Sequence, residues 1–138
     1  MIHEEIVTFE VAKLAKEKGF PQDVDRWLGD LHSATSSNYY NHKGELNGDC
    51  LEIINCICRK EDVPIELQII VAPTQSLLQR WLREEKGLHI TVPFDNNEFW
   101  WQIKNLANRD SEYGEALGFD TYELALEDAL AYSLKNLA

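Results

Sequence analysis

Residues Ala72–Ile103 read APTQSLLQRWLREEKGLHITVPFDNNEFWWQI and decide the fold. The stretch contains a run with helical periodicity, then a glycine, then two runs in which apolar and polar residues alternate. These patterns are typical of an amphipathic helix, a helix stop and a pair of strands. We therefore expect a helix that leads into an antiparallel hairpin at the centre of the core.

The helix is expected at about 74–86. Its apolar residues recur at the spacing of one helix face, namely Leu77, Leu78, Trp81 and Leu82. Pro73 and Thr74 suit its start, because proline has no amide hydrogen to lose there and a threonine hydroxyl can accept one. Gly87 predicts the stop, since glycine readily adopts the left-handed cap conformation.

The hairpin is expected from strands at about 88–94 and 98–104. Alternation places these apolar residues together: Leu88, Ile90, Val92 and Phe94 on the first strand, and Phe99, Trp101 and Ile103 on the second. Asp95–Asn97 predicts the turn, because short polar side chains bond to their own backbone and tolerate positive φ.

Trp100 points to the other side of the second strand, beside Gln102 and Lys104. It is either covered by another helix or exposed as an anchor for a partner, since tryptophan is favoured in binding hot spots. Tyr39 and Tyr40 form a second candidate contact in an expected long exposed loop at 32–49, a stretch rich in serine, asparagine and glycine.

The remaining elements complete an α+β domain. Helices are expected at about 4–18, 22–31 and 121–137, from apolar residues at helical spacing and from capping residues such as Gly19, which predicts the end of the first helix. The buried stripe of the last helix is expected to be Tyr122, Ala125, Leu126, Ala129, Leu130, Leu134 and Leu137. Strands are expected at 65–71 and at 51–58, although 51–58 also fits a short helix, and a short strand is expected near the end of 105–118. The prediction is one domain, 1–138, with an antiparallel sheet of three to five strands packed by the helices.

The chain is strongly acidic, with a formal net charge of −11 over 138 residues. Such a surface repels phosphate backbones and anionic lipids, so general binding to nucleic acid or to a membrane is not expected. No apolar run approaches the roughly 20 residues that span a bilayer. The start, MIHEEIVTFE, is acidic where a signal peptide is basic, and the three cysteines show no disulfide framework. We expect a cytoplasmic protein.

The residues most suited to chemistry are cysteines and histidines. Cys56 and Cys58 would share one face of a strand, and with Cys50 or His42 they could assemble a zinc site. The spacing matches zinc knuckles weakly, and buried cysteines commonly serve as small hydrophobic residues. No catalytic signature and no phosphate-binding glycine loop occurs. We therefore expect no cofactor and lean against an enzyme.

The order helix, strand, strand, strand, helix from Thr74 onward resembles a double-stranded-RNA-binding domain, and also small antitoxins that end in such a helix. These resemblances imply a nucleic-acid-binding or nucleic-acid-mimicking regulator as an alternative. Arg80, Arg83 and Lys86 are the local cluster of cations that could touch phosphate. The acidic residues at the start of the last helix argue against binding of this kind.

Three segments carry a closer resemblance: TFEVAKLAKEKGF, APTQSLLQRWLREEKGLHITV and TYELALEDALAYSLKNL. They resemble small uncharacterised proteins of phages and prophages of gut Bacteroidales. The resemblance implies a phage or mobile-element accessory protein but no activity for any residue. With the acidic surface and the aromatic candidates, it leads to the hypothesis of a non-enzymatic protein-interaction module that acts on an unknown protein partner or as a homodimer. A metal-binding or cysteine-dependent enzyme is the last alternative.

Overall fold

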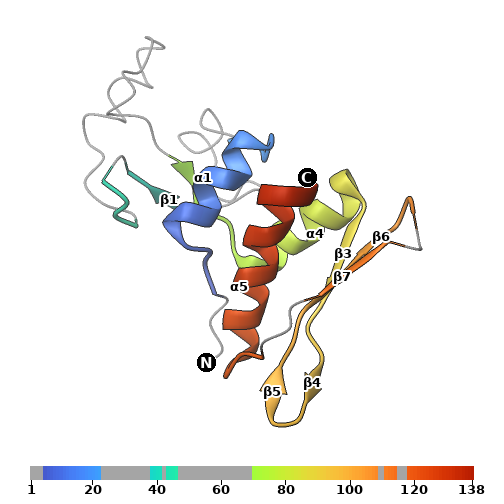
Figure 1. The fold of residues 1–138 in the computed structure, drawn as a ribbon. Coiled ribbons are helices and arrows are strands. Elements are labelled where there is room, and N and C mark those ends of the chain that lie inside the picture. Colours follow the sequence, from blue (N-terminus) through green and yellow to red (C-terminus); the bar gives the residue numbers. More distant parts are fainter. Residues whose placement is uncertain (1–4, 23–37, 42, 47–69, 109–110, 115–117) are drawn as a thin grey trace, which may run out of the picture. The chain divides into compact units, whose positions relative to one another are not determined.

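The computed structural model describes residues 5–22, 38–41, 43–46, 70–108, 111–114 and 118–138 (Figure 1). It contains helices and antiparallel strands, which confirms the α+β class. The chain forms two compact units, a C-terminal unit of Met1–Glu5 with Thr74–Ala138 and an N-terminal unit of Ile6–Pro73. The organisation as one domain stays a prediction.

The C-terminal unit begins with helix α4, Gln75–Lys86. Thr74 is its N-cap, and its hydroxyl accepts a hydrogen bond from the amide of Leu77 at 3.2 Å. Gly87 ends the helix in the left-handed conformation, with φ of +66°. The predicted helix and both of its end signals are therefore confirmed.

The hairpin follows as two short ladders in one register. Strands β3 (Leu88–Thr91) and β6 (Gln102–Asn105) pair antiparallel, and farther out β4 (Phe94–Asp95) pairs with β5 (Glu98–Phe99). The two predicted strands are thus interrupted, because Pro93 has no amide hydrogen to donate to the ladder. Its carbonyl still accepts a hydrogen bond from the Trp100 amide at 2.9 Å.

The turn of the hairpin is formed by Asn96 and Asn97. Their φ angles are 53° and 64°, both in the left-handed region. Two consecutive positive φ angles are the mark of a type I′ turn, whose twist matches that of the flanking strands. The predicted turn chemistry is confirmed.

Strand β7 (Glu112–Gly114) completes a three-stranded sheet of order β3-β6-β7, and it confirms the short strand expected in 105–118. Helix α5 (Tyr122–Tyr132) follows and continues as a π-helical turn, Ser133–Leu137. Thr121 is its N-cap and accepts a hydrogen bond from the Leu124 amide. Tyr122, expected in the buried stripe, is instead 40% exposed.

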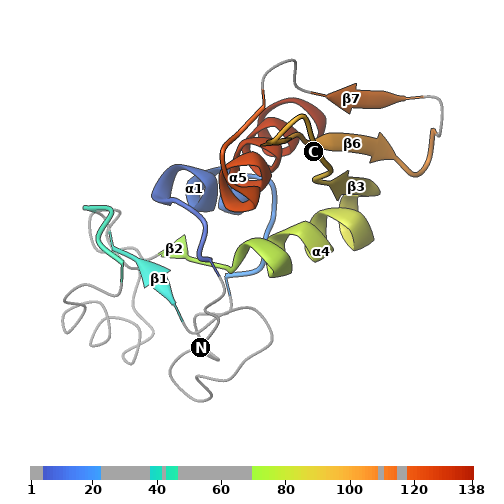
Figure 2. The ribbon, with the colours of Figure 1, turned by 90° about the horizontal axis from the view of Figure 1, so that it is seen from below.

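Helices α4 and α5 pack on the same face of the sheet (Figures 1 and 2). The buried apolar side chains of these elements are Leu78, Leu82, Leu88, Ile90, Trp101, Ile103, Ala125, Leu126, Ala129, Leu130 and Leu134. Gln75 joins the two helices, because its side-chain amide donates to the Glu123 carbonyl at 3.0 Å and to the Glu127 carboxylate at 2.9 Å. The other sheet face carries exposed polar residues such as Thr91 and Gln102.

The N-terminal unit contains helix α1, Phe9–Glu17. The prediction of a helix from about residue 4 is wrong for residues 5–8, since the Thr8 hydroxyl caps the helix at the amide of Val11. Val7 precedes the helix and donates its amide hydrogen to the Pro73 carbonyl at 3.1 Å. The helix end at Gly19, with φ of +98°, was predicted correctly.

The tyrosines of the expected exposed loop form strand β1, Tyr39–Tyr40, which pairs antiparallel with β2, Ile70–Val71. The prediction of an exposed loop is therefore wrong at these residues, because the strand pairing and the contact with α1 bury their rings. The rest of the expected loop, apart from 38, 41 and 43–46, lies outside the described residues. Residues 23–31 of the helix expected at about 22–31, and the segment 51–58, also lie outside the described residues.

Candidate interaction surface

The first predicted contact, Tyr39 with Tyr40, does not lie on the surface. The two residues are only 5% and 9% exposed. The Tyr40 hydroxyl donates a hydrogen bond to the Val7 carbonyl at 2.6 Å, and its ring lies 5.4 Å from that of Phe9. Both tyrosines therefore belong to the core of the N-terminal unit. The expectation that they lie on the surface, where a partner could contact them, is wrong.

Trp100 lies opposite Pro93 in the register of the hairpin, on the polar side of the sheet. The residue is half-buried, and its indole nitrogen donates a hydrogen bond to the Asp95 carbonyl at 3.1 Å. Its side chain thus holds the outer part of the hairpin together. This placement lies between the two alternatives, a ring covered by a helix and a fully exposed anchor.

The cationic candidates lie on the outer side of α4, and two of them have partners within the helix. Arg80 forms an ion pair with Glu84 at 3.0 Å, and the Lys86 ammonium lies 5.5 Å from the centre of the Trp81 ring. Arg83 is exposed, as is the neighbouring Glu85. The helix thus presents mixed charges rather than a continuous basic strip.

The weak metal candidates Cys50, Cys56, Cys58 and His42 all lie outside the described residues. Within the described ranges, no group of three His, Cys, Asp or Glu side chains is placed to hold a metal ion.

A surface that sequence reasoning missed lies at the outer end of the hairpin. Phe94 is 60% exposed, and its ring lies 4.9 Å from that of Phe99. The Phe99 ring in turn meets Tyr122 edge-on, at 6.2 Å between ring centres. We call Phe94, Phe99 and Tyr122 the tip cluster; it is a row of three aromatic rings that solvent reaches.

Backbone hydrogen bonds fix the tip cluster from two sides. Phe94 and Phe99 face each other across the β4–β5 ladder, directly before and after the turn. Phe99 also exchanges two backbone hydrogen bonds of 2.8 Å with Phe119, just ahead of α5. Because Tyr122 begins α5, this bridge sets its ring beside Phe99. The rings therefore sit on an ordered scaffold.

Four carboxylates lie close to the residues of the tip cluster in the chain. Asp95 and Glu98 pair with each other on the hairpin, and Asp120 and Glu123 lie on either side of Tyr122 in the chain. Asp95, Asp120 and Glu123 are exposed, and Glu98 is half-buried. Among the described residues, none of these four side chains forms an ion pair. Asp95 and Glu98 alternate with Phe94 and Phe99 along the ladder, so their side chains lie on the opposite, polar face of the hairpin from the rings.

The hairpin continues deeper into the unit as ordinary core. Trp101, 2% exposed, donates its indole N–H to the Asp128 carboxylate at 2.8 Å, and its ring lies 5.1 Å from that of Tyr132. The aromatic side of the hairpin is thus covered by α5 at Trp101 and open at Phe94.

No helix in the described ranges has the length and apolar composition needed to cross a membrane. The chain matches no protein-family model, no curated protein and no solved structure. The geometry of its surface is therefore the basis for a functional assignment.

Proposed function

We propose that this chain is a phage- or mobile-element-derived accessory protein that acts as a non-enzymatic protein-interaction module in a bacterial cytoplasm. It engages its protein partner through the tip cluster. The observation that carries the proposal is Phe94, which stands 60% exposed against Phe99 on an ordered hairpin. The sequence resemblance to proteins of Bacteroidales phages supports the biological setting.

The chemistry of the tip cluster suits recognition of another protein. Aromatic side chains are enriched at the centres of protein interfaces, where they bring a large contact area with few rotatable bonds. The type I′ turn and the Phe99–Phe119 bridge hold these rings before a partner arrives. Less conformational entropy is then lost on binding, which favours affinity.

The test is affinity capture from a gut Bacteroidales lysate, with and without nuclease, followed by mass spectrometry. The wild-type chain is compared with Phe94→Ser and with Leu106→Ser. Leu106 is a matched control because it is also an exposed apolar residue of the C-terminal unit, at 47% exposed. We expect one nuclease-resistant protein partner that Leu106→Ser retains and Phe94→Ser loses.

Retention of the same partner by Phe94→Ser would overturn the assignment of the tip cluster. A second copy of the chain is the other partner to test, so the oligomeric state of the wild type is measured by light scattering. A dimer that Phe94→Ser converts to a monomer would identify self-association as the interaction.

A second candidate function is nucleic-acid binding through α4. It is favoured by the order of α4, the three-stranded sheet β3-β6-β7 and α5, with the β4–β5 ladder as the outer end of the hairpin between β3 and β6. This is the helix, strand, strand, strand, helix order that the resemblance to double-stranded-RNA-binding domains implies. Such binding would weaken steeply with salt and would be lost in the double variant Arg80→Ala, Arg83→Ala. Salt-independent or absent binding of double-stranded RNA would exclude it.

A further inference from the structure

The first strand of the hairpin is paired along one edge and open along part of the other. The Trp100 amide donates to the Pro93 carbonyl at 2.9 Å, so Pro93 faces the second strand. In an antiparallel ladder every second residue faces the same way, and Val92 and Phe94 therefore direct their amide and carbonyl groups outward. Within the described part of the chain, these four groups have no hydrogen-bond partner.

The unpaired stretch has definite ends. On the α4 side, the Gln79 side-chain amide donates to the Ile90 carbonyl at 2.9 Å and so occupies the edge there. At the other end the turn begins with Asn96, whose φ is 53°. We call residues 91–95 the open edge. It is a short strip of free backbone donors and acceptors, which is a template for pairing with another strand.

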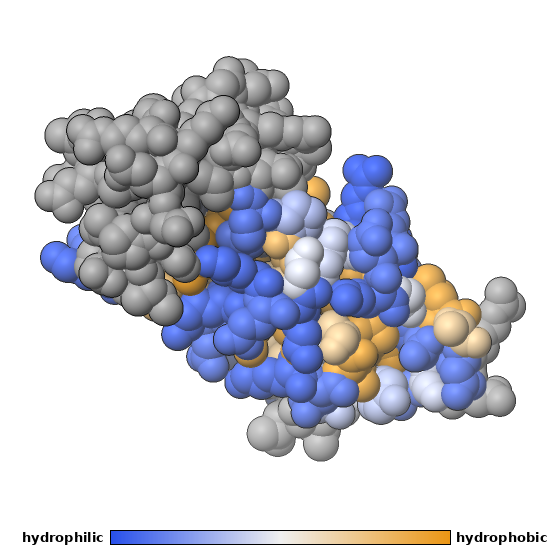
Figure 3. All heavy atoms as spheres, turned by 90° about the horizontal axis from the view of Figure 1, so that it is seen from above, coloured by the Kyte–Doolittle hydropathy of each residue, from blue (hydrophilic) through white to orange (hydrophobic). Residues whose placement is uncertain are grey.

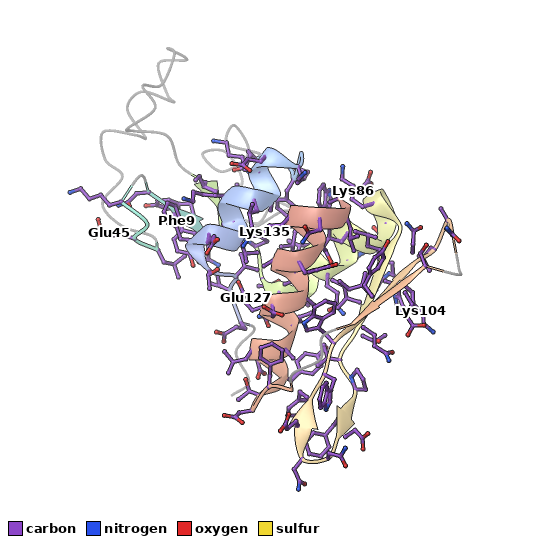
Figure 4. All side chains as sticks on the ribbon, in the orientation of Figure 1. Phe9, Glu45, Lys86, Lys104, Glu127 and Lys135 are labelled. Atoms are coloured by element: carbon purple, nitrogen blue, oxygen red, sulfur yellow. The ribbon has the colours of Figure 1, made fainter. Side chains whose placement is uncertain are left out.

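The open edge lacks the usual protection against such pairing. Edge strands are commonly protected by lysine side chains, by bulges or by a proline that removes an outward amide. The open edge contains no lysine or arginine, and Figure 4 shows Lys86 and Lys104 away from the β4–β5 end. Pro93 removes no outward donor, because its nitrogen faces β5.

Apolar side chains accompany the free backbone groups on one face of the open edge. Val92 is half-buried and Phe94 is 60% exposed, and alternation places both on the face of the tip cluster. By contrast, the view from above in Figure 3 shows hydrophilic residues over most of the described surface, with hydrophobic residues between them. A strand that pairs with the open edge therefore gains backbone hydrogen bonds and apolar contact together.

We infer that two copies of the chain pair antiparallel along their open edges, with Val92 of each copy opposite Phe94 of the other. This inference rests on the proposed function, an interaction module, and names a second copy as a partner. The two pairs exchange four backbone hydrogen bonds, which satisfies every free group of Val92 and Phe94. The result is a two-fold symmetric dimer with one continuous sheet. Its axis is perpendicular to the sheet, so both tip clusters lie on one face.

The open edge is complementary to itself in this register. A β-branched residue faces an aromatic ring in both pairs, which is a favourable combination on one face of a sheet. Pro93 faces its counterpart at a position without interchain hydrogen bonds, so its missing amide costs nothing there. Thr91 faces Asp95, so no two like charges are directly opposite each other.

Other registers leave backbone groups unpaired. A shift of two residues in one direction places Val92 opposite Asn96 of the other copy, inside the turn. A shift in the other direction places Phe94 opposite Ile90, whose carbonyl is already bonded to Gln79. In the inferred register, Ile90 and Asn96 face each other just beyond the last pair. The open edge and the strand that pairs with it therefore have the same length.

The first test measures the dissociation constant of the dimer by sedimentation equilibrium over a series of chain concentrations. Val92→Pro removes one outward amide from each copy, and proline is tolerated where the amide faces out from an edge. Val92→Thr is the matched control, because it changes the side chain and keeps the amide. We expect Val92→Pro to weaken the dimer about tenfold and Val92→Thr about twofold. Equal weakening by both variants would overturn the pairing of the outward amides.

A charge exchange tests the register without altering the backbone. Thr91→Asp should weaken the dimer about fivefold, because it places two carboxylates opposite each other at both ends of the pairing. Adding Asp95→Lys creates an ion pair across the dimer at both ends, and this double variant should dimerise at least as tightly as wild type.

Asp95→Lys alone is the control for net charge. Its net charge is one unit less negative than that of the double variant, yet we expect it to dimerise less tightly, because its lysine faces an uncharged threonine. The reverse order would overturn the register, since association would then follow net charge alone.

The outcome for the proposed function is read separately, by repeating the lysate capture with Val92→Pro. A wild-type chain that stays monomeric at every concentration would overturn the inference. If Phe94→Ser still loses a lysate partner in that case, the interaction module stands. A lysate partner that a monomeric chain loses with both variants would assign the open edge to a segment of that partner instead. A dimer that follows the charge exchange would support the inference even if the lysate yields no partner.

Discussion

The inner and outer halves of the hairpin have the same strand alternation but opposite surroundings. In the inner half, Ile90 faces Ile103, and both are buried beneath the helices. In the outer half, Phe94 faces Phe99, and Phe94 is 60% exposed. Figure 1 shows why: the β4–β5 end of the hairpin extends past the start of α5. The difference shows that the apolar face of one hairpin can be buried core near the helices and exposed surface near the turn.

The largest expected effect tests the inner half. Trp101→Ala should lower the free energy of unfolding by about 3–5 kcal/mol, because it opens a large cavity against Tyr132. It also removes the indole donor of the Asp128 carboxylate. Chemical denaturation measures the loss. Trp100→Ala is the control, and we expect a loss of about 1 kcal/mol from this half-buried position. Equal losses of unfolding free energy in the two variants would contradict the difference in burial between Trp101 and Trp100.

Gly87→Ala tests the point where the helix enters the inner strand. The residue has φ of +66°, and an added Cβ would meet no atom within 4 Å. The cost is therefore one of backbone conformation, about 1–2 kcal/mol in the free energy of unfolding. Gly87→Asn should cost less, since asparagine tolerates this conformation. If thermal unfolding ranks the two variants the other way, the left-handed cap is not the cause.

Ser133→Ala tests a buried polar group in the π-helical turn that continues α5. The Ser133 hydroxyl is fully buried and, among the described residues, has no hydrogen-bond partner. Its removal should stabilise the protein by about 0.5–1 kcal/mol, because a buried polar group without a partner carries a desolvation cost. Urea denaturation measures the change. A loss of stability would indicate that the hydroxyl is bonded in solution.

Phe94→Ser tests the outer half and should have the smallest effect on stability, within about 0.5 kcal/mol of wild type, as is usual for exposed sites. The same variant is expected to lose the protein partner. A large loss of stability would mean that Phe94 contributes to the fold, and its exposed ring would then no longer indicate an interface.

The local elements of the C-terminal unit could be predicted from sequence because their signals are close together in the chain. Thr74 and Gly87 mark both ends of α4, and Asn96 with Asn97 marks the turn. These residues act through their own backbone conformation and nearest hydrogen bonds, so distant contacts do not alter the outcome.

The candidate site was predicted less well. Tyr39 and Tyr40 were expected on the surface from the polar residues around them, but pairing with Ile70 and Val71, some thirty positions away, buries them. Phe94 and Tyr122 were expected in the core from their spacing. Spacing shows which face of a helix or strand is apolar, but it does not show how far along that face other segments of the chain cover it. The acidic residues beside both positions were the one signal that could have indicated exposure.

The sequence by itself determined the α+β class, the position and both ends of α4, and the hairpin turn. Each of these depends on interactions between residues a few positions apart. Only the tertiary structure decided that Trp101 is core and Phe94 is surface, although both lie on the same face of one hairpin. That outcome depends on how far α5 reaches along the sheet, which is set by packing between distant segments.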